Sequence, residues 1–328
     1  MTNTKQKRRK QYKRDAPSVS IRLTQRDIEI IKLVWKYRFI NSEHIMVLID
    51  GSSQGINRRV KNLFHAGYLD RPKAQVLKFG KRPMVYALGN KGADILAEEF
   101  DMPRQAVDWT SKNREVKGIF LDHTLMITNF LVMVQVACKN IQGVEFIDLE
   151  EIINNRPILP KAKDKALSWQ VQFNKIQIGK NYTEFKKNIV FSIFPDGAFG
   201  LRFPEAKKNL QEIYFFLEAD RSSMPISIPR NNIFRSSFFK KITGYWNSWK
   251  QELFLKNFGF KNPRLLTITI SKQRIESMIK SNKALDPRGQ GLRMFLFAPE
   301  QAFNLKNPAK IFEKIWINGR GEQASIID

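Results

Sequence analysis

The segment 24–88 limits the fold of this chain more than any other part of its sequence, because several short helical periods follow one another within it. Thr24 is a good helix N-cap, and Asp27 stands three residues later, where a capping box places an acid. Apolar residues then recur at helical spacing, which predicts a first helix that ends near Tyr37. A second short helix is predicted to begin near Ser42.

A third helix is predicted over residues 53–66, after an Asp-Gly-Ser break in the chain. Its apolar residues recur at helical spacing and would form one buried face, made of Ile56, Val60, Leu63 and Phe64. Gly67 follows as a residue that easily takes the left-handed conformation, so the helix is predicted to end there.

Two extended segments, 68–71 and 84–88, flank a basic turn at 78–82 and predict a β-hairpin, and a closing helix is expected over 92–100. Three helices followed by a two-stranded wing are typical of a winged helix-turn-helix, whose third helix enters the major groove of DNA. A winged helix that binds another protein is the alternative. The predicted DNA contacts on the third helix and the wing are Ser53, Gln54, Asn57, Arg58, Arg59, Lys61, Lys78, Lys81 and Arg82.

The charge of the chain indicates a polyanionic partner. Its 56 lysines and arginines exceed its 31 acids by 25, and a fold does not need such an excess. Nucleic acid is the first candidate and an anionic membrane surface the second. Because 42% of the residues are hydrophobic, the chain is not a disordered basic tail. The segment 1–19 is predicted to be a disordered basic arm, in which Arg8 and Arg9 would contact phosphates.

Several classes of protein are excluded by what the sequence lacks. Cys138 is the only cysteine, so disulfides and thiolate zinc sites are excluded. The three histidines are far apart, and no phosphate-binding Gly-x-x-x-x-Gly-Lys-Ser/Thr motif occurs. The longest apolar run, 125–138, is interrupted by polar residues, and the N-terminus has no signal-peptide core. A cytoplasmic protein without a membrane span is therefore expected.

The remaining patterns predict a second domain of α/β type. A polar segment at 105–118 is taken as a linker between a winged-helix domain at 20–104 and a second domain at 119–328. A long apolar helix is expected from 120 to about 139, and the lysine-rich stretch 154–182 is taken as an excursion outside the core. Strands then follow, with one helix from 234 to about 255, another over 272–281 and a short last helix around 311. The fold class is thus a two-domain α+β and α/β chain, with a mixed sheet flanked by helices.

Acidic residues stand where apolar strands of this second domain end. Asp196 follows one predicted strand, and Glu218 and Asp220 end another. Because side chains alternate along a strand, Glu218 and Asp220 are predicted to lie on the same face. Three carboxylates in close proximity repel one another unless a cation such as Mg²⁺ or Mn²⁺ neutralises them. Lys241 and Tyr245 are spaced i, i+4 on a predicted helix that follows. The alternatives are a simple turn at Asp196 and solvated acids at a strand end.

At this point the chain resembles known proteins. Pro195-Asp196 followed by Glu218-x-Asp220 resembles the signature of PD-(D/E)xK nucleases, which have the restriction-endonuclease-like fold. Over about 20–300 the chain resembles the replication-relaxation family of plasmid and mobile-element proteins, and its two-part plan is also similar to MOBC-type relaxases. The motifs that carry the family resemblance include Leu23-Thr24-x-Arg26-Asp27, Ala66-Gly67-Tyr68-Leu69-Asp70-Arg71, His123-x-Leu125, Phe216-Leu217-Glu218-x-Asp220-Arg221 and Lys241-Ile242-x-x-Tyr245.

The resemblance implies a relaxase-like endonuclease that binds origin-like double-stranded DNA and nicks it with Mg²⁺ or Mn²⁺. Single-stranded DNA would be a partner after nicking, and a homodimer is left open. The residues that the resemblance assigns to the site are the metal ligands Asp196, Glu218 and Asp220, the lysine Lys241, and His123.

One departure from the nuclease pattern leaves a second function open. The nuclease motif has a lysine where this chain has Asp220, so catalysis would depend on Lys241. Tyr245 is either a transesterifying nucleophile or an aromatic residue that packs on the sheet. The alternative to a nickase is a non-catalytic origin-binding or regulatory protein whose nuclease domain is degenerate.

Overall fold

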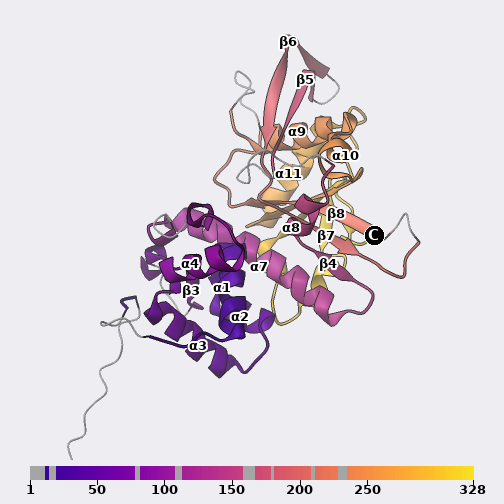
Figure 1. The fold of residues 1–328 in the computed structure, drawn as a ribbon. Coiled ribbons are helices and arrows are strands. Elements are labelled where there is room, and N and C mark those ends of the chain that lie inside the picture. The colour runs from indigo at the N-terminus through magenta and orange to yellow at the C-terminus, as the bar shows by residue number, and fades with distance from the viewer. Residues whose placement is uncertain are drawn as a thin grey trace, which may run out of the picture. The chain divides into compact units, whose positions relative to one another are not determined.

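The structure is a computed structural model that describes residues 12–14, 20–77, 82–107, 113–157, 167–178, 181–207, 211–227 and 235–328. The chain forms two compact units, Met1–Val132 and Met133–Asp328. Each unit has its own helices and its own sheet (Figure 1). The long helix α7 (Gly118–Asn140) belongs to both, since the division falls within it.

The N-terminal unit consists of helices and a small sheet, as the sequence predicts. Its three strands lie in the order β1-β3-β2, and all pairs are antiparallel. Strand β1, which pairs with β3, was not expected. The elements are α1 (Gln25–Tyr37), β1 (Ile40–Asn41), α2 (Ser42–Leu48), α3 (Ser53–Ala66), β2 (Leu69–Asp70), the 3-10 helix η1 (Lys73–Leu77), β3 (Val85–Leu88), α4 (Asn90–Glu99) and α5 (Arg104–Val107).

The ends of α1 and α3 follow from their capping residues. The Asp27 carboxylate accepts hydrogen bonds from the backbone N–H (2.6 Å) and the hydroxyl (2.7 Å) of Thr24, which holds the start of α1. Ser52 caps the start of α3, where its hydroxyl accepts from the Gly55 N–H at 3.2 Å. Gly67 ends α3 with φ at +93°. In this conformation any residue that has a side chain would be strained. These helix limits confirm the predicted ones.

The first part of α7 packs into the N-terminal unit. Leu121 lies in an apolar cluster with Phe39, Val85 and Ala87, and the Thr128 hydroxyl donates to the Phe39 carbonyl at 3.0 Å. The compact unit therefore extends past the segment 105–118 that the sequence marks as a linker. Among the described helices, α7 is the one long and apolar enough to cross a membrane by length and composition, a test that core helices of soluble proteins also pass.

The C-terminal unit contains a mixed sheet of seven strands with flanking helices, which confirms the predicted architecture in outline. The strand order is β12-β11-β10-β9-β8-β7-β4, in which β8, β9 and β10 are parallel and the outer pairs antiparallel. The strands are β4 (Glu145–Ile147), β7 (Gly197–Arg202), β8 (Glu212–Asp220), β9 (Arg264–Thr269), β10 (Phe295–Pro299), β11 (Trp316–Asn318) and β12 (Gln323–Ala324).

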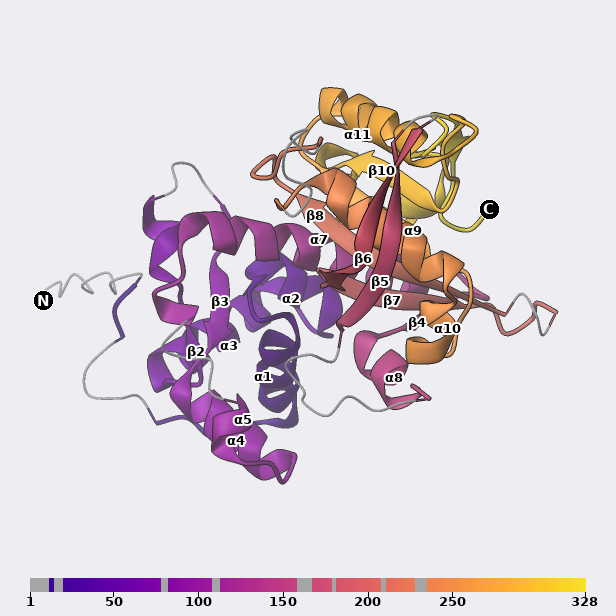
Figure 2. The ribbon, with the colours of Figure 1, turned by 90° about the horizontal axis from the view of Figure 1, so that it is seen from above.

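The expectation that 154–182 lies outside the core is wrong. Strand β5 (Trp169–Ile178) pairs with β6 (Asn181–Ile193) in a long antiparallel hairpin, which both views show beside helix α9 (Figures 1 and 2). Trp169, Val171 and Phe173 are buried in the main apolar cluster. They alternate with glutamines on the other face of the strand. The alternation typical of a strand is therefore present within this lysine-rich stretch.

The helices of this unit are α8 (Leu149–Asn154), α9 (Phe238–Lys250), α10 (Leu253–Phe258) and α11 (Lys272–Leu285), with short 3-10 helices η4 (Glu300–Ala302) and η5 (Pro308–Phe312). The single helix expected over 234–255 is wrong. Glu252 has φ at +54°, a left-handed conformation that ends one helix and allows α10 to begin in another direction. Aromatic side chains from these helices and from β8 form much of the core, including Phe216, Tyr245 and Phe254.

Candidate functional site

Asp196 is held beside Glu218 by the backbone of β8. Its N–H donates to the Leu217 carbonyl at 3.0 Å, and its carboxylate accepts from the Ala219 N–H at 2.8 Å. Asp196 directly precedes β7, whose first residue pairs with Leu217. The two hydrogen bonds therefore fix Asp196 at the level of Glu218, at the end of two neighbouring strands.

Glu218 is buried and bound through both of its carboxylate oxygens. Oε2 forms an ion pair with Nζ of Lys241, and Oε1 accepts a hydrogen bond from the Tyr245 hydroxyl at 2.6 Å. Lys241 and Tyr245 lie one turn apart on α9, so a single helix face supplies both donors. Tyr245 is itself buried in the aromatic core, where its hydroxyl positions Glu218.

The surroundings of Glu218 bring the pKa of its carboxyl close to neutral pH. Burial raises the pKa of Glu218 to about 7, although Lys241 opposes the shift; the nearby Asp196 adds to it. Burial alone would lower the pKa of Lys241, but the attraction of Glu218 and Asp196 raises it above its ordinary value. Lys241 therefore stays charged, and the carboxyl beside it can exchange a proton near neutral pH.

Asp220 has a different cation, which comes from another helix. Its Oδ1 accepts from the Arg274 guanidinium at 2.8 Å, and its Oδ2 is bound both by Arg274 and by the Thr269 hydroxyl at 3.0 Å. Arg274 lies in the first turn of α11, directly after β9, the parallel neighbour of β8. The charge of Asp220 is thus compensated within the protein.

The donor set around these acids suits a hard divalent cation only in part. Carboxylate oxygens of Asp196 and Glu218 are ligands that Mg²⁺ accepts. Both oxygens of Glu218 are already bound by Lys241 and Tyr245, and both oxygens of Asp220 by Arg274 and Thr269. Within the described ranges, no group of three or more histidine, cysteine or acidic side chains is placed so that it could hold a metal ion. His123 lies on α7 in the N-terminal unit, half-buried.

The predicted DNA-contacting residues of α3 divide into two groups. Ser53, Gln54, Asn57, Arg58 and Lys61 are exposed, while the opposite face of α3 is buried in the core of the unit. Arg59 is instead paired with the fully buried Asp27 and donates to the Arg22 carbonyl at 2.6 Å. Arg82 is exposed beside the predicted wing. Arg8, Arg9, Lys78 and Lys81 lie outside the described residues.

Two arginines of these clusters were not predicted from the sequence. Arg274 stands 54 residues from its partner Asp220, and nothing in a local pattern signals that pairing. Arg14 donates to the Phe64 and Leu69 carbonyls at 2.9 Å each, at the end of α3. Its position in a run of basic residues is the same as that of its neighbours, so the sequence did not distinguish it.

Comparison with known proteins decides the family. The family model described as Replication-relaxation matches residues 31–261, which is more than half of the chain. The chain belongs to the replication-relaxation family. This confirms the resemblance to that family, and membership in it indicates a role associated with plasmid replication and with DNA. No curated protein and no solved structure gives a significant match.

Proposed function

We propose that this replication-relaxation protein is a duplex DNA-binding protein that recognises an origin-like site through α3. The observation that carries the proposal is the division of α3 into a buried apolar face and an exposed polar and basic one. Three helices followed by the antiparallel pair of β2 and β3 match the element order of a winged helix, in which such a face enters the major groove. The excess of 25 positive charges supports an anionic partner.

Binding to an origin fragment and to a random duplex of equal length tests this proposal. Arg58→Ala should weaken binding to the origin about tenfold and binding to the random duplex less, because a side chain that reads a base contributes mainly to the specific complex. Lys32→Ala on α1, where the ammonium pairs with Glu99, is the matched loss of one charge and should change neither. Equal losses on both duplexes with Arg58→Ala would contradict base recognition.

As a second function we propose that the C-terminal unit is a restriction-endonuclease-like nicking domain of the PD-(D/E)xK type. The observation that favours it is the cluster of Asp196, Glu218 and Lys241 at the ends of β7 and β8. Asp196 and Glu218 would hold Mg²⁺ or Mn²⁺, which supplies charge stabilisation at a scissile phosphate when bound. Lys241 holds a positive charge at this cluster, and Tyr245 orients the Glu218 carboxylate.

A DNA-binding protein without catalysis is the competing interpretation of the same unit. The pairs Glu218–Lys241 and Asp220–Arg274 compensate the buried acids without any metal. Such pairs would be expected if the nuclease fold serves only as a structural support for DNA contact. The two interpretations differ in whether the cluster is needed for strand cleavage or only for folding.

Nicking of a supercoiled plasmid that carries the cognate origin separates them. With Mg²⁺ or Mn²⁺ we expect relaxation that EDTA abolishes, and we expect Glu218→Gln and Asp196→Asn to lose it while they retain DNA binding. Glu212→Gln is the control on the same strand, because Glu212 pairs with Arg202 away from the cluster. Tight origin binding without nicking under any of these metals would favour the non-catalytic interpretation.

A further inference from the structure

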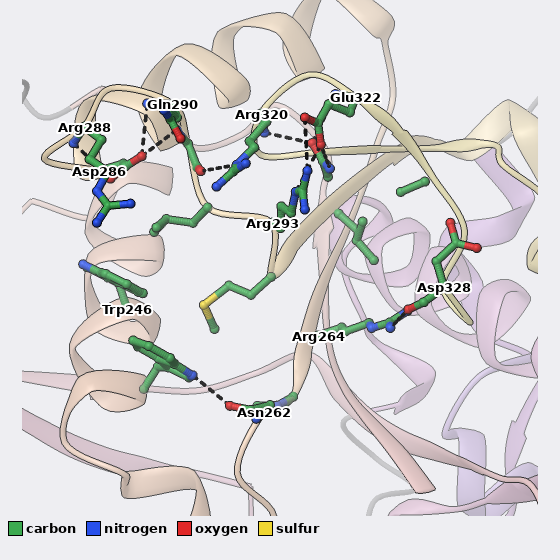
Figure 3. A pocket seen from close by; sticks show the side chains of 18 of the residues that line it. Trp246, Asn262, Arg264, Asp286, Arg288, Gln290, Arg293, Arg320, Glu322 and Asp328 are labelled. Atoms are coloured by element: carbon green, nitrogen blue, oxygen red, sulfur yellow. Dashed lines mark hydrogen bonds and ion pairs between the residues drawn. The ribbon is translucent and has the colours of Figure 1, made fainter. Parts of the chain in front are cut away.

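A broad groove lies in the C-terminal unit, apart from the acidic cluster. Its volume is about 1040 Å³, and its wall is formed by one turn of α9, by the loop 286–292 and by the segment 318–328 (Figure 3). This volume is at the upper limit of about 300–1,000 Å³ that is usual for small-molecule pockets, so the groove has room for more than one small metabolite. Most of its lining comes from residues 262–328, beyond the part of the chain that the family model matches. The groove is therefore a feature that family membership does not explain.

Two tryptophans of α9 form an aromatic wall in the groove. The rings of Trp246 and Trp249 stack with centroids 4.9 Å apart and planes within 5°. Trp249 is held by a hydrogen bond from its indole N–H to the Asn262 side chain at 3.0 Å, yet it remains 39% exposed. An exposed indole with a fixed orientation is unusual for a side chain whose role is packing, since burial would remove more apolar surface from water. It offers a flat surface on which another ring can stack.

The acids near the groove are bound by groups of the protein itself. The Asp286 carboxylate accepts backbone hydrogen bonds from Arg288, Gln290 and Gly291, at 2.9 to 3.1 Å, and so shapes the loop. The Glu322 carboxylate is bound by Arg293 and by the Asn318 amide. Arg293 therefore offsets the charge of Glu322, while the charge of Asp286 is directed into its own loop.

Two arginines of the lining can contact an anion, and one of them, Arg320, also attracts the nearby Glu322 carboxylate. Arg288 is exposed, and in Figure 3 it lies at the same end of the groove as Trp246. Arg320 donates one hydrogen bond, from Nε to the Gly291 carbonyl at 3.3 Å, which orients its guanidinium beside the same loop. Arginine is suited to phosphate because its planar guanidinium donates two parallel hydrogen bonds. Aromatic rings and arginines in one groove match the two parts of a nucleotide.

We propose that this groove binds a short stretch of single-stranded nucleic acid, with an unpaired base on Trp249 and phosphates on Arg288 and Arg320. A duplex keeps its base faces stacked inside, so it does not offer a free ring to the indole. A single nucleotide would contact only part of a groove of this volume. The groove shares no lining residue with α3 or with the Glu218 cluster, so the proposal does not depend on nicking.

Fluorescence anisotropy of a short labelled oligothymidylate, at fixed salt, tests the proposal with the full-length chain. Trp249→Ala and Arg288→Ala should each weaken binding about tenfold, and Trp249→Phe should retain most of it because a ring remains. Lys310→Ala on η5, an exposed lysine outside the groove, is the matched control for charge and should have no such effect. Both alanine substitutions fall on exposed side chains, so folding should be retained and circular dichroism would verify it.

The competing outcomes are distinct. Equal affinity of wild type and both alanine variants for the oligothymidylate would overturn the proposal, as would a preference of the groove for duplex over single strand. Weak binding by the wild type together with tight binding of thymidine monophosphate would also overturn it, in favour of a nucleotide site. Arg58→Ala should leave oligothymidylate binding unchanged while it weakens origin binding, so a failure of the groove and a failure of the proposed duplex recognition would be told apart.

Discussion

The exposed face of α3 and the end of β8, one in each unit, place their charged residues in opposite ways. On α3 of the N-terminal unit, Arg58 and Lys61 project into solvent and have no part in its core. On β8 of the C-terminal unit, Glu218 and Asp220 are buried, and each needs a cation from a neighbouring helix. An outward charge acts on a partner molecule, whereas an inward charge must first be compensated for the fold to form. Substitution of a charged residue should therefore affect binding on the exposed face of α3 and folding at the end of β8.

The largest effect is expected from Arg274→Ala. It leaves the buried Asp220 without its cation, which should lower the free energy of unfolding by about 3–5 kcal/mol. Thermal and urea unfolding would measure the loss, and adding Asp220→Asn should recover part of it because no charge is then left unpaired. A loss below about 1 kcal/mol would show that Asp220 is solvated, and the contrast between the units would fail.

A pH series tests the N-terminal unit, in which the buried His44 is kept neutral. Burial lowers the pKa of His44 to about 4, although the hydrogen bond with Asn129 opposes the shift. Because the folded pKa lies below the unfolded value, the contribution is complete above pH 6.5 and is lost as the pH falls toward 4. It should amount to about 3 kcal/mol.

Urea unfolding at pH 7 and at pH 4.5 measures this dependence on pH. His44→Gln should show a smaller loss of stability than wild type between these two values, because glutamine does not titrate. Comparing the two proteins removes the contribution of the acids that titrate in the same range. Parallel losses in both would show that His44 is not kept neutral by burial.

Two adjacent arginines of α3 give the finest test. Arg59→Ala breaks the pair with the buried Asp27 and should cost about 2 kcal/mol of stability, below the full range for a buried pair because the Arg59 side chain is partly exposed. Arg58→Ala should change stability by less than about 0.5 kcal/mol and reduce only DNA binding. Unfolding free energy and duplex affinity should be measured on both variants. If each variant changed both the stability and the affinity, this division would be contradicted.

Local signals predicted the N-terminal unit well. The limits of α3 followed from the Asp-Gly-Ser break before it, an apolar face at helical spacing and Gly67 after it, all of which lie in or next to the helix itself. The hairpin of β2 and β3 followed from two extended segments around a turn. These signals lie close together in sequence, so they can be recognised from one amino-acid sequence.

The candidate site was predicted only in part, because its interactions are distant in sequence. Glu218 and Lys241 were assigned to one site, but their ion pair was not predicted. Arg274, which compensates the charge of Asp220, lies on a helix that was expected, yet 54 residues separate the two and no local pattern signals their pairing. The same holds for Arg59, whose partner Asp27 is 32 residues away. Strand β5 was missed for another reason. The lysine-rich composition of the surrounding segment indicated a loop, although apolar and polar residues alternate within the strand itself.

The edges of the sheets have a consequence for the solubility of this protein. The seven-stranded sheet ends in β4 and β12, of 3 and 2 residues, which leaves few unpaired backbone groups for another chain to pair with. The hairpin of β5 and β6 is different, because in the described part of the chain it forms a sheet of its own and has open edges on both sides. Its exposed lysines, Lys186 and Lys187 among them, oppose the approach of a second hairpin by charge repulsion and so protect the protein against aggregation through these strands.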